Sequence, residues 1–301
     1  MRAFSVSPVT KKPYGIRRVC RCWDMPKSTF YHKAKDKYPD NINLKKPGPI
    51  PVISDEELLK EIKERIDNSL FIGEGHRKIW AFLKYRRGLR VSRRRVLNIM
   101  RLNNLLSPHR SLRRDKKLHD GTITTDSPDI MYGTDASKIW TWDQGWVWVF
   151  TAVDHCHGEV VGWHVAKKGT RYAALEPIMQ ALEKYWHGTL ANCARGLQLR
   201  MDNGCQYTSD HFINQIRYWG ITPSFGYPRE PETNGVVERF NRTLKEQIIY
   251  GRTYRNIEEL SDAIRTFIDA YNHHWMLEKN GYLSPMEKRN EFNGFIDKKA
   301  A

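Results

Sequence analysis

Two stretches on either side of a polar loop decide the fold: LRMDNGCQYTS (Leu199–Ser209) and NGVVERFNRTLK (Asn234–Lys245). The first predicts a strand that ends at Asp202, because apolar residues alternate up to that point and an Asn-Gly pair then turns the chain. The second predicts a helix with Glu238 near its first turn, behind a polar capping residue. Ligands of α/β sheets usually bind where strands end, so these two carboxylates are candidates for one site.

The predicted helix places Glu238 and Lys245 on the same face. Helical residues advance by about 100° each, so seven residues come within about 20° of two full turns. Arg242 lies close to that face. The neighbouring apolar stripe consists of Val237, Phe240, Leu244 and Ile248. A carboxylate with basic residues beyond it on one helix suits a metal site beside a nucleic-acid backbone.

A third carboxylate is expected upstream, and Asp135 in YGTDAS (Tyr132–Ser137) fits, because it lies near the end of another predicted strand. Phosphodiester cleavage needs an activated attacking oxygen, a stabilised leaving oxygen and in-line geometry, and two divalent ions about 3.5–4 Å apart provide all three. Magnesium keeps several waters, so a few carboxylates hold it. Taken singly, an Asp-Asn-Gly is usually a turn, and a glutamate early in a helix usually interacts with the helix dipole.

Together these motifs resemble the IS-three family of bacterial insertion-sequence transposases, and within it the second-frame protein with a retroviral-integrase-type DDE core. The family has Asp-Asn/Arg-Gly-x-Gln-Tyr/Phe-x-Ser at the second acid, which Asp202–Ser209 matches throughout. At the third acid it has Asn-Gly-x-x-Glu, with a lysine seven residues later, which Asn234–Lys245 matches. The 35 residues between the two acids are the family's spacing. The family's Trp-x-x-Asp-x-Thr at the first acid is weakened here to Tyr132–Ser137.

The resemblance implies an α/β ribonuclease H-like catalytic core, a mixed five-stranded sheet with helices, preceded by an all-α helix-turn-helix region. It implies that Asp135, Asp202 and Glu238 bind two Mg²⁺ or Mn²⁺ ions. The implied reaction is cleavage of transposon ends by water, then attack of the freed 3′-hydroxyl on a second phosphodiester, through a circular intermediate. The implied partners are double-stranded DNA at transposon ends and target, and a second copy of the chain, since synapsis joins two ends. Family members often act as a fusion with an upstream frame, so this chain is a candidate for one half of the working enzyme.

Four residues close to the carboxylates are candidates for contact with DNA: Asn203, Gln206, Arg242 and Lys245. Asn234 is expected instead to position the helix that carries Glu238. Two other functions stay open. One is a ribonuclease H-like nuclease or integrase without transposition, which strand-transfer assays would distinguish. The other is a non-catalytic DNA-binding regulator, against which the three carboxylates argue, because binding alone does not need them.

The formal net charge is +16, and it is unevenly distributed. Residues 1–126 hold 30 Lys and Arg against 13 Asp and Glu, whereas the remainder holds 20 against 21. This excess in the N-terminal part is the charge pattern expected of a phosphate-binding surface.

The longest apolar run, Trp146–Val153, is far shorter than the ~20 residues of a membrane span, so a cytoplasmic, nucleoid-associated protein without a membrane partner is expected. Five irregularly spaced cysteines predict free thiols rather than disulfides or a zinc site.

The chain order predicts alternating helical regions and linkers. A helical hairpin or a helix-turn-helix remnant is expected first, and a proline-rich stretch follows it. The predicted divisions are a helical hairpin at 1–38, a linker at 39–53, a helix-turn-helix DNA-binding domain at 54–106, a basic linker at 107–129, the catalytic core at 130–250 and a helical tail at 251–301.

Three helices are predicted within residues 54–106. Ser54 and Glu57 form a capping box before the first, and Ser92 caps the third. The first turn of the third helix carries Arg93, Arg94 and Arg95, which are expected to contact DNA as in a helix-turn-helix. The alternative is that these arginines form a solvated face.

Five strands are predicted in the core, at about 130–136, 146–154, 159–166, 196–201 and 221–225, with helices at about 170–186, 209–219 and 256–273. The loop at 226–233 is expected to be mobile without DNA. The tryptophan-rich stretch Trp140–Trp148 is expected to form a hairpin and pack in the core, with a nucleic-acid stacking platform as the alternative. The sequence His155-Cys156-His157 is expected to be a turn between strands rather than a metal site.

Overall fold

The computed structural model describes residues 5–35, 51–107, 123, 125–226 and 234–300. The chain divides into two compact units, residues 1–51 and 52–301. In the first unit, α1 (Ile16–Cys22) and α2 (Lys27–Lys35) form the expected helix, break and helix, and Cys20 packs against Phe30. Among the described helices, none has the length and apolarity that a bilayer crossing requires.

The second unit begins with three helices around a small apolar core. They are α3 (Asp55–Asp67), α4 (His76–Tyr85) and α5 (Arg93–Leu102). The predicted capping box is confirmed, because Ser54 Oγ accepts from the Glu57 amide while the Glu57 carboxylate accepts from the Ser54 amide. Ser92 Oγ accepts from the Arg95 amide at the start of α5. The core of this helical domain consists of Leu58, Ile62, Ile79, Leu83, Val96, Ile99 and Met100.

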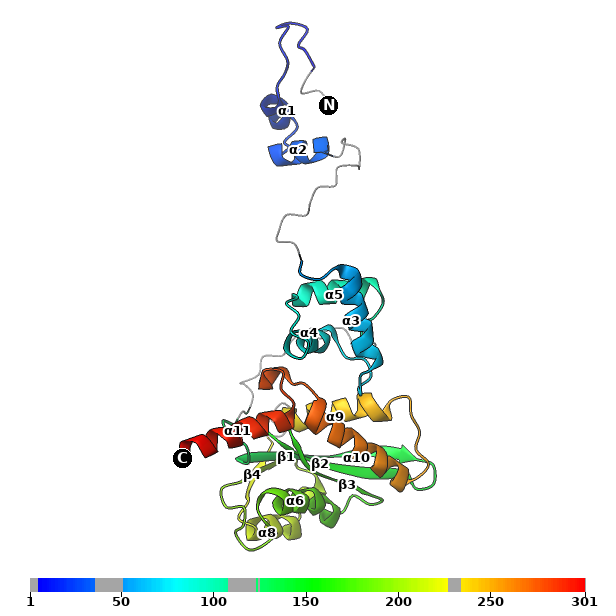
Figure 1. The fold of residues 1–301 in the computed structure, drawn as a ribbon, viewed down its shortest axis with the longest axis vertical. Coiled ribbons are helices and arrows are strands. Elements are labelled where there is room, and N and C mark those ends of the chain that lie inside the picture. Colours follow the sequence, from blue (N-terminus) through cyan, green and yellow to red (C-terminus); the bar gives the residue numbers. More distant parts are fainter. Residues whose placement is uncertain (1–4, 36–50, 108–122, 124, 227–233, 301) are drawn as a thin grey trace. The chain divides into compact units, whose positions relative to one another are not determined.

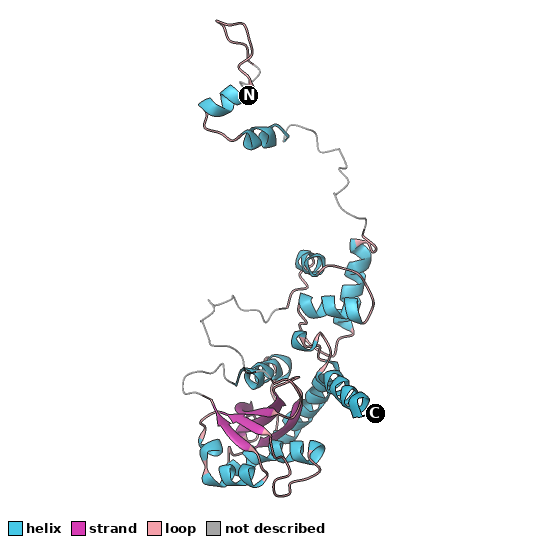
Figure 2. Cartoon of the chain, turned by 90° about the vertical axis from the view of Figure 1, so that its left-hand side faces the viewer, coloured by secondary structure: helices cyan, strands magenta, loops and turns pink. Residues whose placement is uncertain are grey.

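A mixed five-stranded sheet with helices forms the rest of the unit, which confirms the predicted ribonuclease H-like fold class (Figure 2). The spatial order is β3-β2-β1-β4-β5, with β1, β2 and β3 antiparallel and β4 and β5 parallel to β1. The strands are β1 (Met131–Thr141), β2 (Gly145–Asp154), β3 (Val160–Ala166), β4 (Gln198–Met201) and β5 (Thr222–Phe225).

Helices cover both faces of the sheet (Figure 1). On one face, α6 (Arg171–Tyr185) and α8 (Asp210–Tyr218) pack on a core that includes Tyr132 and Phe150. On the other face, α9 (Gly235–Leu244) and α10 (Ile257–His274) pack on Ile139 and Val147. The alternation along β1 and β2 therefore divides their side chains between two cores.

Three short elements link the longer helices: α7 (Cys205–Thr208) directly after Asp202, the π-helix η3 (Lys245–Ile249) that continues α9, and the 3-10 helix η4 (Glu278–Asn280). The long helix α11 (Pro285–Ala300) follows in the tail. The sequence did not predict α7, or the change of helix type at Lys245. Such π-turns inside helices are frequent at functional sites.

A buried ionic network joins α11 to the turn after β2. Arg289 donates from Nη1 and Nη2 to the Asp129 carboxylate at 2.8 and 2.9 Å, and from Nε to Glu159. Glu159 also accepts from Lys184 Nζ at 3.0 Å and from His157 Nε2 at 3.1 Å. Because Arg289 and Glu159 are almost completely buried, each depends on the other for charge compensation.

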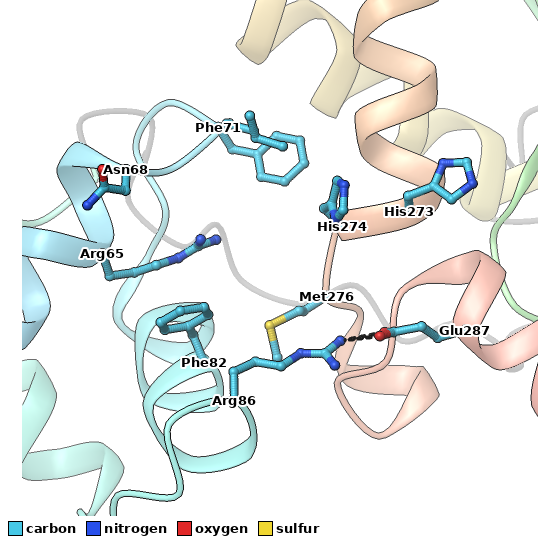
Figure 3. A pocket seen from close by; sticks show the side chains of 10 residues that line it. Arg65, Asn68, Phe71, Phe82, Arg86, His273, His274, Met276 and Glu287 are labelled. Carbon is cyan, nitrogen blue, oxygen red and sulfur yellow. Dashed lines mark hydrogen bonds and ion pairs between the residues drawn. The ribbon is translucent and has the colours of Figure 1, made fainter.

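The helical domain packs against the core through a few specific contacts. Gln247 on η3 accepts from the Ile72 amide and donates to the Ile72 carbonyl, both over 2.8 Å. Phe71 is buried among core residues, with its ring 4.7 Å from the ring of Trp275. Arg86, directly after α4, donates to Glu287 on α11 beside a cavity of about 450 Å³ (Figure 3).

Two expectations about the first hairpin need correction. The first strand runs to Thr141, five residues beyond its predicted end, because β2 pairs with it along its full length. The hairpin forms as expected, but Trp140, Trp142 and Trp146 do not pack in the core: they are 48%, 67% and 59% exposed. The same face of β1 is buried at Tyr132 and exposed at Trp140, so alternation alone could not tell covered from uncovered positions. The predicted loop at 226–233 and most of the linkers at 39–53 and 107–129 lie outside the described residues.

Candidate active site

Asp135 lies in the middle of β1, and its carboxylate is held from two sides. Asn241 on α9 donates from Nδ2 to Asp135 Oδ2 over 2.9 Å. The Ala136 amide donates to Asp135 Oδ1 over 2.8 Å. Burial raises the pKa of the Asp135 carboxyl above its usual range, and these two hydrogen bonds act against that rise. The negative charge of Asp202 raises this pKa further, whereas Lys245 lowers it, so both groups lie within electrostatic reach of Asp135.

Asp202 follows β4 directly, at the end that lies beside β1. The parallel pairing of Gly133 with Arg200 places the end of β4 next to the middle of β1. The Gly204 amide donates to Asp202 Oδ1 over 3.0 Å, which closes the predicted Asn-Gly turn. The hydroxyl of Tyr207 lies beneath this site, and its pKa is raised by burial and by the charges of both aspartates. Asp135 and Asp202 thus share one environment.

Glu238 lies in the first turn of α9, and its side chain is exposed. It lines a cavity of about 630 Å³ between α9 and the helical domain, together with Lys78, Arg239 and Arg242. It is on the same helix as Asn241, three residues away, and Asn241 contacts Asp135. The surroundings of the two aspartates are therefore built from β1, from the end of β4 and, through Asn241, from α9, which are far apart in the sequence.

The position of α9 on β1 depends on close contacts that the sequence did not reveal. Asn234 Nδ2 donates to the Thr134 carbonyl over 3.1 Å and its side chain makes no capping bond, which agrees with the expectation that Asn234 positions the helix of Glu238. A Cβ atom on Gly133 would lie 2.5 Å from Val237 Cγ2, so only glycine lets α9 approach this closely. Thr151 Oγ1 donates to Asn241 Oδ1 over 3.0 Å, which fixes the amide that holds Asp135.

The four residues expected to contact DNA near the carboxylates lie in different surroundings. Asn203 is exposed and donates weakly to the Gly226 carbonyl at 3.4 Å. Gln206 is buried beside Gly204 and Asp202, so its side chain supports the turn. Arg242 is exposed and pairs with Glu246 at 3.0 Å. Lys245, at the junction of α9 and η3, lies close enough to Asp135 to lower its pKa.

Two of the three arginines on α5 have partners within the protein. Arg95 contacts Asp55 Oδ1 at 2.6 Å and donates to the Ile53 carbonyl, so it stabilises the helical domain. Arg93 lies over the ring of Trp80 and 3.5 Å from Glu278. Within the described residues, Arg94 is exposed and has no ion-pair partner, which leaves it the most available to phosphate.

The turn after β2 contains a group of ligand-type side chains. One ligand atom each from Asp154, Cys156 and His157 lies within 4.8 Å of the others. Burial by itself would lower the pKa of His157, but contacts with Asp154, Cys156 and Glu159 raise it to about 10. Its ring nitrogens face Asp154 and Glu159 at 3.2 and 3.1 Å. Both ring nitrogens of His157 therefore lie against carboxylates of the protein.

Asn241 is the site residue that the sequence analysis missed. Its position within NGVVERFN offered a signal, because it is a polar residue next to the apolar stripe of a helix, one turn after Glu238. Buried polar side chains usually have specific hydrogen-bond partners. Gly133 and Thr151 offered no signal of this kind, since most strand glycines and threonines have no helix packed closely against them.

Family models match the part of the chain that forms the sheet. Two of them, both described as integrase core domain, match residues 126–231 and 219–285. Among solved structures, the catalytic core domain of BIV integrase matches 56% of this chain and 97% of that chain, at 24% identity and a TM-score of 0.42. The simian T-cell lymphotropic virus intasome in complex with PP2A regulatory subunit B56 gamma matches 76% of this chain and 74% of that chain, at 17% identity and a TM-score of 0.47.

Curated relatives extend the likeness over nearly the whole chain. The transposase for insertion sequence element IS629 of Shigella sonnei is 26% identical over 301 residues, which cover 95% of both chains. Transposase InsD for insertion element IS2D of Escherichia coli is 26% identical over 237 residues, covering 74% of this chain and 76% of the relative. The chain is therefore a transposase with an integrase core domain, a DDE polynucleotidyl transferase, and it is similar over nearly its whole length to transposases of bacterial insertion sequences.

Proposed function

We propose that this transposase cleaves DNA at the ends of its element and joins the freed 3′-hydroxyl to a second phosphodiester, with Asp135, Asp202 and Glu238 as the catalytic carboxylates. The observation that carries the proposal is the meeting of Asp135 and Asp202 at the end of β4, beneath the helix that bears Glu238. Nothing in the packing of the described fold requires two aspartates to repel each other there, so the arrangement serves chemistry.

The donor set fits two Mg²⁺ or Mn²⁺ ions. Carboxylate oxygens are the hard ligands that these ions prefer. The charge of Asp202 raises the pKa of Asp135, and a cation offsets such repulsion between neighbouring carboxylates. When bound, the ions would supply Lewis-acid stabilisation of the attacking and leaving oxygens.

The residues of the chain would position the substrate and the carboxylates. Asn241 keeps Asp135 oriented, and the Asp202 turn is held by the Gly204 amide. Lys245, within electrostatic reach of Asp135, would bind a phosphate oxygen of the terminal DNA. Asn203 and Arg242 are both exposed and would contact the same backbone. Gln206 would act mainly through the turn that it supports.

The helical part of the chain would supply most of the affinity for double-stranded DNA. The excess of Lys and Arg in residues 1–126 fits phosphate contacts, and Arg94 is less engaged within the protein than Arg93 or Arg95. We propose the division into a helical hairpin (1–38), a linker (39–53), a DNA-binding domain (54–106), a second linker (107–129), the catalytic core (130–250) and a tail (251–301). Synapsis of two ends would require at least a homodimer, and an upstream-frame product is a further candidate partner.

Purified protein and supercoiled plasmid that carries the two ends of the element test this function. With Mg²⁺, we expect nicks that leave 3′-hydroxyl groups at the ends, followed by strand joining. Specific binding without nicking would favour a non-catalytic regulator. Nicking without joining, with or without the upstream-frame product, would favour a nuclease.

A further inference from the structure

The hairpin of β1 and β2 carries two exposed tryptophans beyond the active site. Trp140 lies five residues after Asp135 on β1, about 17 Å further at ~3.4 Å per residue. Because this spacing is odd, its side chain lies on the opposite face of the sheet, the face that α6 covers, whereas Asp135 faces α9. It pairs across the hairpin with Trp146, and the two rings are 5.5 Å apart and almost perpendicular. They remain 48% and 59% exposed. Exposed tryptophans at paired positions are costly to keep in water, which points to a ligand.

Cations lie beside the next tryptophan along the hairpin, Trp148. Lys138 precedes Trp140 by two residues on β1, so the two side chains lie on the same face of the sheet. Its Nζ is 4.6 Å from the ring centre of Trp148, the residue opposite it on β2. Trp148 is opposite Ala166, the last residue of β3, after which come Lys167 and Lys168, both exposed.

The basic and aromatic pattern continues into α6. A Cβ atom on Gly169 would lie 2.5 Å from the ring of Trp148, so the start of α6 lies against this tryptophan. The helix then opens with Arg171, whose guanidinium is 5.2 Å from the ring of Tyr172. The nearest acidic residue in the hairpin turn, Asp143, is 3.6 Å from Arg255.

This local charge is unusual for its surroundings. Residues 127–301 hold 20 Lys and Arg against 21 Asp and Glu, so the catalytic part as a whole is not basic. The four cations named above are all exposed, and they lie on one stretch of the fold. We call this surface the hairpin platform; it consists of Lys138, Trp140, Trp146, Trp148, Lys167, Lys168, Arg171 and Tyr172.

We propose that the hairpin platform binds an unpaired DNA strand that leaves the active site and passes round the hairpin to the α6 face of the sheet, with bases stacked on Trp140 and Trp146 and phosphates on the neighbouring lysines. Aromatic side chains interleaved with cations are the arrangement by which proteins hold single strands without sequence preference. The proposal rests on the proposed function, because it assumes that DNA occupies the site at Asp135. A double helix hides its base faces, so only frayed or cleaved ends offer a partner for these rings.

An interface between copies of the chain fits this platform less well. Burying the lysines against an apolar partner would leave their charges without compensation, whereas DNA phosphates provide it. The two rings are nearly perpendicular, so each keeps edges or faces open to a flat base rather than closing on the other.

Fluorescence anisotropy with two labelled probes tests the proposal: a blunt duplex of about 20 base pairs, and the same duplex with an unpaired tail of about 10 thymidines. We expect the natural protein to bind the tailed probe about tenfold more tightly. Trp140→Ala and Trp146→Ala should bring the two affinities within about twofold, as expected for the loss of one stacked base. Trp146→Leu keeps the apolar bulk in the hairpin and should have the same effect, which separates stacking from folding.

The matched control is Tyr218→Ala, because Tyr218 is 53% exposed on α8, outside the platform. It should keep the tenfold preference. The platform proposal alone is overturned if the tryptophan variants still prefer the tailed probe. It is also overturned if the natural protein binds the blunt duplex and shows no preference for the tailed probe. Failure to bind either probe overturns the proposed function with it. If the tryptophan variants keep the preference but change the sedimentation of the protein, the surface joins copies of the chain instead.

Discussion

Asn241 on α9 donates a hydrogen bond from Nδ2 to Oδ2 of Asp135 on β1, over 2.9 Å. The same amide accepts from Thr151 on β2, so one buried side chain connects the helix of Glu238 to two strands of the sheet. The position of α9 beside Asp135 therefore depends on a residue that has no charge and that we do not expect to touch DNA.

Asn241→Ala should slow strand cleavage by about 10–100-fold, the usual cost of losing a group that orients a metal-binding carboxylate. The concentration of Mg²⁺ that gives half-maximal rate should rise, because Asp135 loses its fixed orientation. Thr151→Val, which removes only the support of the amide, should shift both quantities in the same direction but less. Unchanged metal dependence in Asn241→Ala would contradict this role, provided that the variant shows the natural melting transition.

The sequence predicted the strands and helices of the core closely, because their periodic apolar patterns are long. It also predicted which loops and helix ends carry Asp202 and Glu238. It could not predict Asn241 as a support, or the burial of Gln206, since these depend on contacts between β1, α7 and α9. The exposure of Trp140 and Trp146 depends on where α6 ends on the sheet, which a strand's own pattern does not contain.

Arg289→Met should lower the free energy of unfolding by about 3–5 kcal/mol, because Asp129 and Glu159 would lose the cation that compensates them. Denaturant titration at neutral pH measures this change. Arg265→Met on α10 is the control, since Arg265 and its partner Asp262 are exposed, and it should cost less than about 1 kcal/mol. Equal effects of the two substitutions would show that the tail network does not stabilise the core.

The stability of the core should fall as the pH rises from about 6.5 to about 10. The pKa of His157 in the folded protein is raised to about 10. Protonated His157 therefore contributes its full stabilisation below the ordinary histidine pKa of about 6.5, and this contribution is lost as the pH rises towards 10. The slope contributed by His157 is at most about 1.4 kcal/mol per pH unit. His157→Gln should flatten this dependence, whereas substitution of the exposed His273 should not. Parallel stability curves for the natural protein and His157→Gln would rule the network out as the cause.

Glu159 should produce the opposite dependence in acid. Burial acts to raise the pKa of its carboxyl, but His157, Arg289 and Lys184 lower it to about 2. The contribution of ionised Glu159 to the free energy of unfolding is therefore complete above about pH 4.5 and is lost as the pH falls towards 2. Acid titration of unfolding in the natural protein should show this loss, and it should be reduced in Arg289→Met.

Gly162→Ala should destabilise the fold by about 1–3 kcal/mol or more, because a Cβ atom there would lie 1.9 Å from the Pro177 carbonyl oxygen of α6. Thermal unfolding measures the effect. Gly294→Ala on α11 is the control, since nothing lies within 4 Å of the added atom, and it should be neutral or slightly stabilising. A natural melting temperature in Gly162→Ala would mean that α6 does not approach β3 this closely.

The most direct test of the carboxylate site compares Glu238→Gln with the natural protein on DNA that carries the element's ends, in Mg²⁺ and at equal DNA occupancy. Glu258→Gln, an exposed glutamate at the start of α10, serves as the matched control. We expect Glu238→Gln to bind the ends as the natural protein does while cleavage and joining fall by about 10³-fold or more, and Glu258→Gln to react normally. Normal cleavage by Glu238→Gln would contradict the assignment of Asp135, Asp202 and Glu238 as the catalytic site.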